Sequence, residues 1–162
     1  THLWEMCAIN DPINFYHGEK VGVGLCLISK KNKNALAKIK EGNYKVKNSV
    51  DVEFDLIHSK VTNEALQQEI IKENTPNLLA NIHGSLLKEK ENEIIAILEE
   101  LPSSEDIISW MKKVNALTTM HELTLDESLK PLTLRMSPYA RQRLTFMRLL
   151  KFYDFYDEII GE

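Results

Sequence analysis

A chain of 162 residues, 43% of them hydrophobic and 27% charged, has the composition of one ordinary globular domain. Its net charge of −4 argues against nucleic acid as a partner, because nucleic-acid-binding domains normally carry a basic patch. No apolar run approaches the roughly 20 residues that span a bilayer, and no signal peptide is visible. Cys7 and Cys26 lie in apolar stretches, so we interpret both as reduced core thiols of a cytoplasmic protein.

The first nine residues read as the middle or end of an amphipathic helix. Thr1 could cap this helix, but the residue three positions later is Trp4 and not an acid, so no capping box supports a helix start. We therefore expect residues 1–162 to be one helical domain from which an N-terminal part is missing.

A turn cluster at Asn10–Asn14 separates this segment from a largely apolar stretch, Val21–Ile39, which predicts one long helix. Whether that helix is interrupted near residues 32–34 stays open. Seven lysines between Lys30 and Lys47 are interpreted as a solvated face, with a patch for an anionic ligand as the alternative. Residues 50–57 alternate like a strand but have no partner strand, so we expect an extended connector.

The remaining elements are predicted to be helical and to be joined by short loops. The expected helices cover residues 63–73, which end before Thr75-Pro76, then 77–82, 86–101, 103–114 with Ser103 as its cap, one that opens at Thr124, and 139–153. With no strand–glycine-loop–helix unit, the sequence contains no dinucleotide fingerprint. The fold class predicted from these elements is an all-α multi-helical bundle.

The strongest local signal is the segment that begins with His17 and Gly18 at the start of the long helix. The positive end of a helix dipole favours neutral imidazole, which is the form that binds a metal. Glu19 could accept a hydrogen bond from this ring or could stabilise the first helical turn. Without further support, a histidine at such a place is more often an ordinary surface residue.

His2 is the second candidate, because the turn at Asn10–Asn14 can fold the chain back and bring His2 towards His17. A catalytic zinc or iron ion is normally held by three protein ligands. At most two are available here, so we expect an incomplete metal site. His58, His83 and His121 have no partners at ligand spacing, and we assign them no function.

The segment His17-Gly18-Glu19-Lys20-Val21-Gly22-Val23-Gly24 resembles the His-Gly-Glu-x-Val-x-x-Gly motif of the iron-containing alcohol dehydrogenase, glycerol dehydrogenase and dehydroquinate synthase superfamily. The His2-Leu3-Trp4-Glu5-Met6 and Tyr139–Thr145 segments are similar to its glycerol-1-phosphate dehydrogenase branch. The resemblance implies a C-terminal dehydroquinate synthase-like helical domain, with His17 as a metal ligand. A second histidine ligand would precede Thr1, and His2 would be a catalytic residue near the reacting oxygen.

That resemblance implies hydride transfer between NAD or NADP and a polyol or polyol phosphate, at a carbonyl polarised by zinc, iron or nickel. The nicotinamide cofactor would be held mainly by the missing nucleotide-binding domain, so residues 1–162 are expected to be inactive alone, with a homo-oligomer possible. Arg141 and Arg143 are interpreted as exposed charges, with a contact to substrate phosphate as the alternative. A dehydroquinate synthase-like lyase domain and a non-catalytic helical interaction module remain alternative functions.

Overall fold

The computed structural model describes residues 1–161, and they form an all-helical fold, as the sequence predicts. The α-helices are α1 (His2–Glu5), α2 (His17–Glu41), α3 (Phe54–Lys60), α4 (Glu64–Glu73), α5 (Gly84–Glu89), α6 (Glu91–Glu100), α7 (Ser104–Lys113), α8 (Lys130–Met136), α9 (Phe146–Leu149) and α10 (Tyr156–Gly161). Four 3-10 helices lie among them: η1 (His121–Leu123), η2 (Glu127–Leu129), η3 (Ser137–Tyr139) and η4 (Leu150–Phe152). No helix in the described residues is both long and apolar enough to cross a membrane.

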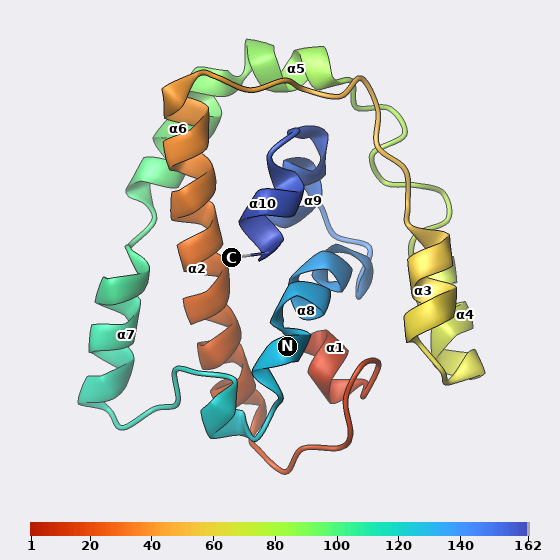
Figure 1. Ribbon diagram of the computed structural model, residues 1–162, viewed down its shortest axis with the longest axis vertical. Helices are drawn as coiled ribbons and strands as arrows, with labels where there is room; N and C mark the ends of the chain where they lie inside the picture. The colour runs from red at the N-terminus through yellow and green to blue at the C-terminus, as the bar shows by residue number, and fades with distance from the viewer. Residues whose placement is uncertain (162) are drawn as a thin grey trace.

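Helix α2 organises the fold, with α6 and α7 along one side and α8 to α10 on the other (Figure 1). It runs for 25 residues without interruption, which settles the question left open at residues 32–34. Lys33 lies in that stretch and donates to the carbonyl oxygens of Leu98 and Glu99 at the end of α6, at 2.8 and 3.3 Å. Gly42 ends α2 in the left-handed conformation, at φ 72°, which glycine adopts without steric cost.

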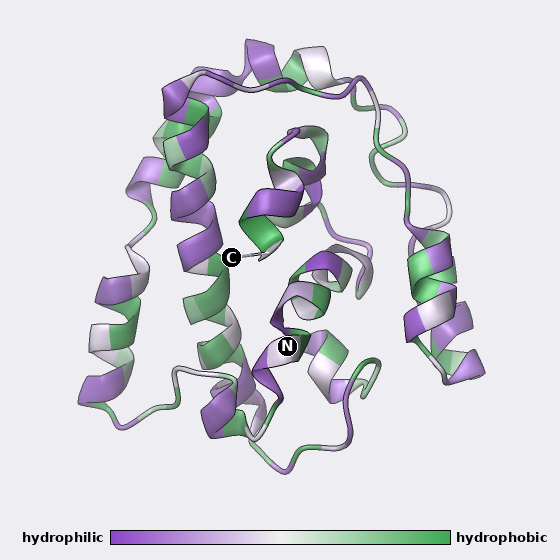
Figure 2. Ribbon diagram, in the orientation of Figure 1, coloured by the Kyte–Doolittle hydropathy of each residue, from purple (hydrophilic) through white to green (hydrophobic). Residues whose placement is uncertain are grey.

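The lysine-rich segment of α2 is only in part the solvated face that the sequence predicts. Lys31 is 1% exposed, and Lys33 is bound to carbonyl oxygens of α6. The long helix therefore buries one of these lysines and turns a second towards the end of α6. Figure 2 shows hydrophobic and hydrophilic residues mixed along each longer helix, as expected of elements that bury one face.

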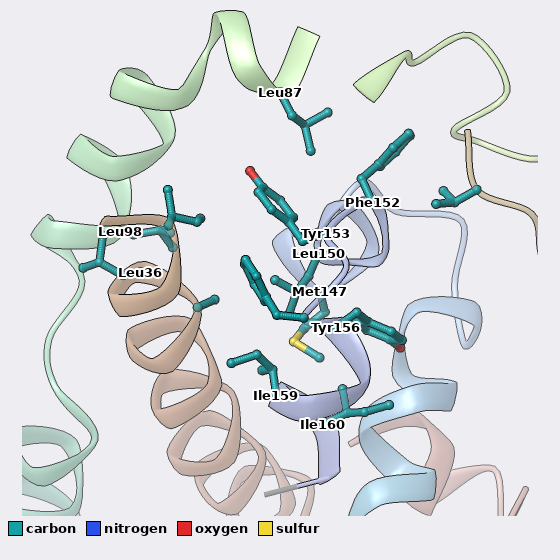
Figure 3. Close-up of a cluster of buried hydrophobic side chains, with 14 of the residues drawn as sticks. Leu36, Leu87, Leu98, Met147, Leu150, Phe152, Tyr153, Tyr156, Ile159 and Ile160 are labelled. Atoms are coloured by element: carbon teal, nitrogen blue, oxygen red, sulfur yellow. The ribbon is translucent and has the colours of Figure 1, made fainter. Parts of the chain in front are cut away.

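The largest core cluster lies between α2 and the C-terminal helices (Figure 3). Most of its buried members come from α2, α5, α6, α8 and the last part of the chain, and they include Leu36, Leu87, Leu98, Met147, Leu150, Phe152, Tyr153, Tyr156, Ile159 and Ile160. Two smaller clusters lie around Ile57 and around Trp4. These three clusters bring segments far apart in the sequence into one folded unit.

An isolated antiparallel bridge between Val46 and Tyr153 joins the link after α2 to the link before α10. The Lys47 N–H donates to the Phe152 carbonyl oxygen at 2.8 Å, and the Asp154 N–H donates to that of Lys45 at 3.1 Å. Within residues 1–161 no longer strand extends this pairing.

The helix predicted over residues 139–153 is wrong. The chain forms η3, leaves helical structure over residues 140–145, and resumes in α9, where Thr145 caps the helix by accepting from the Arg148 N–H. Arg148 is 1% exposed, and its guanidinium binds the carbonyl oxygens of Pro138 and Arg141 and the side chain of Asn74. A continuous helix would use those carbonyls internally, so the buried guanidinium favours the break.

Other predictions also need correction. Residues 77–82 form a turn and not a helix, and Thr124 has a left-handed conformation, so the element expected to open there is the 3-10 helix η2, which Asp126 caps. The helix predicted over residues 86–101 is two helices that meet at Lys90, where six consecutive polar residues, 88–93, offer nothing to bury. The connector predicted over residues 50–57 becomes helical at Phe54, the start of α3. Cys7 is exposed and not a core thiol, whereas Cys26 is buried as predicted.

The first helix is also shorter than its sequence pattern, because α1 ends at Glu5. Cys7 adopts a left-handed conformation at φ 50°, and the Ala8 N–H donates to the Leu3 carbonyl oxygen at 3.0 Å. The Cys7 N–H donates to that of Trp4 at 3.2 Å, which completes a Schellman motif. This motif reverses the chain and returns it towards the start of α2.

Candidate functional site

The reversal after α1 places both predicted site histidines beside one carboxylate, that of Glu5 at the end of α1. His17, the first residue of α2, donates from Nδ1 to Glu5 Oε1 at 2.6 Å. His2 lies one turn before Glu5, with its Nδ1 3.8 Å from Glu5 Oε2. The Lys20 ammonium, which is largely buried, lies 3.7 Å from Glu5 Oε1. The turn at residues 10–14 thus brings His2 and His17 together as the sequence suggests.

The charges around Glu5 keep it ionised. Burial acts to raise the pKa of Glu5, but the hydrogen bond from His17 and the nearby positive groups outweigh burial and lower it. The pKa of His2 is lowered by burial and by the charge of Arg141, against the opposing effect of Glu5. The neutral form of His2 is therefore favoured, and this form can accept a hydrogen bond or bind a metal.

The two histidines line one hollow of about 240 Å³, between α1, the start of α2 and α8. The His17 side chain is 64% exposed and that of His2 is 41% exposed, so both rings remain accessible. Trp4 fixes α1 against α8, because its Nε1–H donates at 3.2 Å to Oγ1 of Thr133, a residue that lines this hollow. The site therefore rests on a buried side-chain contact between α1 and α8.

Glu19 is not the partner of the His17 ring. Its carboxylate accepts from the Tyr16 N–H at 2.7 Å, so it stabilises the first turn of α2, the second of its two predicted roles. Sequence reasoning missed Glu5 as the partner of His17. The signal was present, because Glu5 lies one turn after His2 on the same short helix.

The remaining histidines lie elsewhere, whereas the two arginines are near enough for their charge to lower the pKa of His2. His58 Nδ1 is 2.9 Å from Gln67 Oε1, and His83 and His121 do not line the hollow. Arg141 is half-buried and binds Glu69 at 3.2 Å, and Arg143 is exposed.

The donor set at this site fits part of a metal centre. In metalloproteins a ligating histidine usually donates its second ring N–H to a carboxylate or carbonyl, and Glu5 stands in that relation to Nδ1 of His17. No group of three or more His, Cys, Asp or Glu side chains within residues 1–161 is placed to hold a metal ion. With His17 as a ligand, the remaining ligands of a catalytic site with three protein ligands would have to come from outside this group.

Comparison with known proteins finds no family model, no curated protein and no solved structure that matches this chain.

Proposed function

We propose that the chain is the metal- and substrate-binding domain of an NAD(P)-dependent glycerol-1-phosphate or polyol dehydrogenase that acts in the cytoplasm. The observation that carries the proposal is the ring of His17, which Glu5 orients at a hollow shared with His2. The same histidine belongs to the motif that resembles the superfamily. The free state of both cysteines agrees with a reducing compartment.

In this proposal the two histidines have different tasks. Glu5 accepts the Nδ1–H of His17 and leaves the lone pair of Nε2 available for a metal ligand bond. A divalent zinc, iron or nickel ion bound there would polarise the substrate carbonyl and stabilise the charge that develops on its oxygen. His2 hydrogen-bonds the reacting oxygen through the ring nitrogen that does not face Glu5.

The nicotinamide cofactor would be held by a separate nucleotide-binding domain, because no strand–loop–helix unit lies in residues 1–161. We therefore expect residues 1–162 to be inactive when alone. The substrate would be a small polyol or polyol phosphate, a size that the hollow of about 240 Å³ accommodates.

The test measures bound metal and activity in the intact protein as expressed from its gene. His17→Ala should lose metal through dialysis and lose the metal-dependent oxidation of NAD(P)H by dihydroxyacetone phosphate. Glu5→Gln should keep the site but bind metal about 10 to 100 times more weakly, the usual effect of losing a partner that orients a ligand. The control is His121→Ala, whose ring lies outside the hollow. Full metal content and activity in His17→Ala would refute the assignment.

A second candidate is a helical interaction module without catalysis. Apolar side chains are exposed on α2 and α7, where Leu25 is 49% exposed and Trp110 is 54% exposed, and these helices flank a groove of about 210 Å³. The metal measurement separates the candidates. Equal metal content in the wild type and His17→Ala, with no turnover in the intact protein, would favour the module.

A further inference from the structure

A second hollow, of about 230 Å³, lies beside α10 and the segment that follows α2, and the proposed dehydrogenase site does not use it. Arg135 of α8 lines this hollow, whereas Thr133 of the same helix and Ser137, the residue just after it, line the one with the histidines. Successive residues of an α-helix are about 100° apart, so Arg135 points to the opposite side of α8 from these two. The two hollows are therefore separate sites.

Glu53 lines this hollow, and both of its carboxylate oxygens are engaged. Oε1 accepts from Arg135 Nε at 2.7 Å, and Oε2 binds the Lys151 ammonium and accepts from the Tyr139 hydroxyl at 2.9 Å. The Lys151 side chain is only 8% exposed. Two cations thus share a single carboxylate, and Asp157 binds only Arg135, at 3.2 Å.

Donors at this hollow remain unused. The Tyr156 side chain is 3% exposed, and its hydroxyl has no hydrogen-bond partner within residues 1–161. Figure 3 shows the Tyr156 hydroxyl at the edge of the core cluster, on the side that faces away from α2. A buried hydroxyl without a partner is unfavourable, so such a group in a lined hollow points to an absent acceptor.

The Lys47 ammonium adds a further donor. It lines the same hollow and makes no ion pair with any residue from 1 to 161. The bridge at Val46 holds the Lys47 backbone in place, because the Lys47 N–H donates to Phe152. Burial lowers the pKa of Lys151, Glu53 opposes that effect, and Arg135 and Lys47 add to it through charge repulsion. An anion between the two ammonium groups would relieve this repulsion.

We propose that this hollow binds a small monocarboxylate, with its oxygens held by Lys47, Lys151 and the Tyr156 hydroxyl. A single charge suits the lining better than a phosphate dianion, because Asp51, Glu53 and Asp157 also face the hollow. Lys47 ends the lysine-rich segment, so one residue of that segment serves an anionic ligand while others pack against α6.

The proposal is tested by titrating the full chain with sodium acetate and following backbone amide signals by NMR, against sodium chloride at equal ionic strength. Wild-type protein should show saturable shifts at residues 47–53 and 156–157. Lys47→Gln should weaken acetate binding about tenfold or more, because a charged hydrogen bond is lost, and Tyr156→Phe about threefold or more. Neither change removes a hydrogen bond between described residues, and thermal unfolding of each variant verifies its fold.

Lys112→Gln is the matched control, since it removes one positive charge from an exposed position on α7. It should bind acetate as the wild type does. Shifts that grow linearly without saturation, or an equal loss in Lys112→Gln, would overturn the proposal. Inorganic phosphate that binds more tightly than acetate at the same amides would overturn the choice of a monocarboxylate.

Discussion

Replacing Glu53 with Gln should lower the free energy of unfolding by about 3 kcal/mol, because it leaves a buried ammonium group without its counter-charge. The Glu53 carboxylate accepts hydrogen bonds from Lys151, Arg135 and Tyr139. The substitution keeps the size of the side chain and removes only the charge and part of the acceptor capacity. The effect therefore measures electrostatic support and not lost packing.

The magnitude comes mainly from Lys151, whose side chain is 8% exposed. Breaking a buried ion pair by removing one partner costs about 3–5 kcal/mol. Arg135 is 40% exposed and can be hydrated again, so its pairing contributes little. Lys151 can also lose its proton, since burial already lowers its pKa, and this relief places the expected loss at the lower end of the range.

Urea unfolding followed by far-UV circular dichroism provides the measurement. An unchanged slope of the free energy of unfolding against urea concentration would indicate an unchanged fold. The double variant Glu53→Gln/Lys151→Met should recover much of the loss, because it removes the unpaired charge together with its partner. A loss below about 1 kcal/mol in Glu53→Gln, or no recovery in the double variant, would refute this account of the buried network.

The Glu53 carboxylate should also affect how the free energy of unfolding depends on pH. Burial acts to raise the pKa of Glu53, but hydrogen bonds from Lys151 and Arg135 outweigh it and hold the pKa below its ordinary 4.5. A carboxyl group with a depressed pKa in the folded state stabilises the protein above its unfolded pKa, and this contribution is lost as the pH falls through the folded value. The free energy of unfolding should therefore decline below pH 4.5, and less steeply in Glu53→Gln. Identical acid profiles would contradict this reasoning.

Gly84→Ala should destabilise the protein by about 2 kcal/mol in urea unfolding, because its new Cβ would lie 2.1 Å from the Lys47 carbonyl oxygen. Gly18→Ala, in the first turn of α2, should instead be neutral or stabilise the protein by up to about 1 kcal/mol, because no atom lies within 4 Å of the new Cβ. An equal loss of stability in both variants would show that the contact with the Lys47 backbone is not the cause. Trp4→Phe should lower the free energy of unfolding by about 1–3 kcal/mol. The Trp4 side chain is only 1% exposed, so the smaller ring leaves a void in the core, and the hydrogen bond to Thr133 is lost. A Trp4→Phe variant whose midpoint of thermal unfolding equals that of the wild type would contradict this expectation.

Local signals predicted the fold where one segment determines its own structure. Ser103 caps α7 by accepting from the Asp106 N–H, and α4 ends at Glu73, before Thr75-Pro76, as the sequence indicates. The all-α class followed from the spacing of apolar residues alone.

Contacts between distant residues decided the rest. The helix predicted over residues 139–153 fails because Arg148 turns inward to carbonyl oxygens and to Asn74, 74 residues away. No periodicity in the sequence reveals that a charged residue on a helical pattern will be buried. The pairing of Glu53 with Lys151, 98 residues apart, is equally hidden.

The candidate site could be predicted in part from local sequence signals. The approach of His2 to His17 could be predicted, because a short turn separates two helical segments. The spacing of Glu5 from His2 marked it as a candidate partner, but its contact with His17 depends on how α1 ends at Cys7, a left-handed position that residues other than glycine adopt only rarely.

The position of α9 and α10 at the centre of the largest core cluster affects how this protein can be made. Half of the buried residues in that cluster lie after residue 146, and they pack on α2 residues more than 100 positions earlier. Such pairings must close a long loop before they are stabilised, which slows folding. On the ribosome, the apolar face of α2 stays uncovered until residues 147–160, more than 100 positions later, are synthesised. We therefore expect nascent chains that stall before Met147 to be degraded or to bind chaperones.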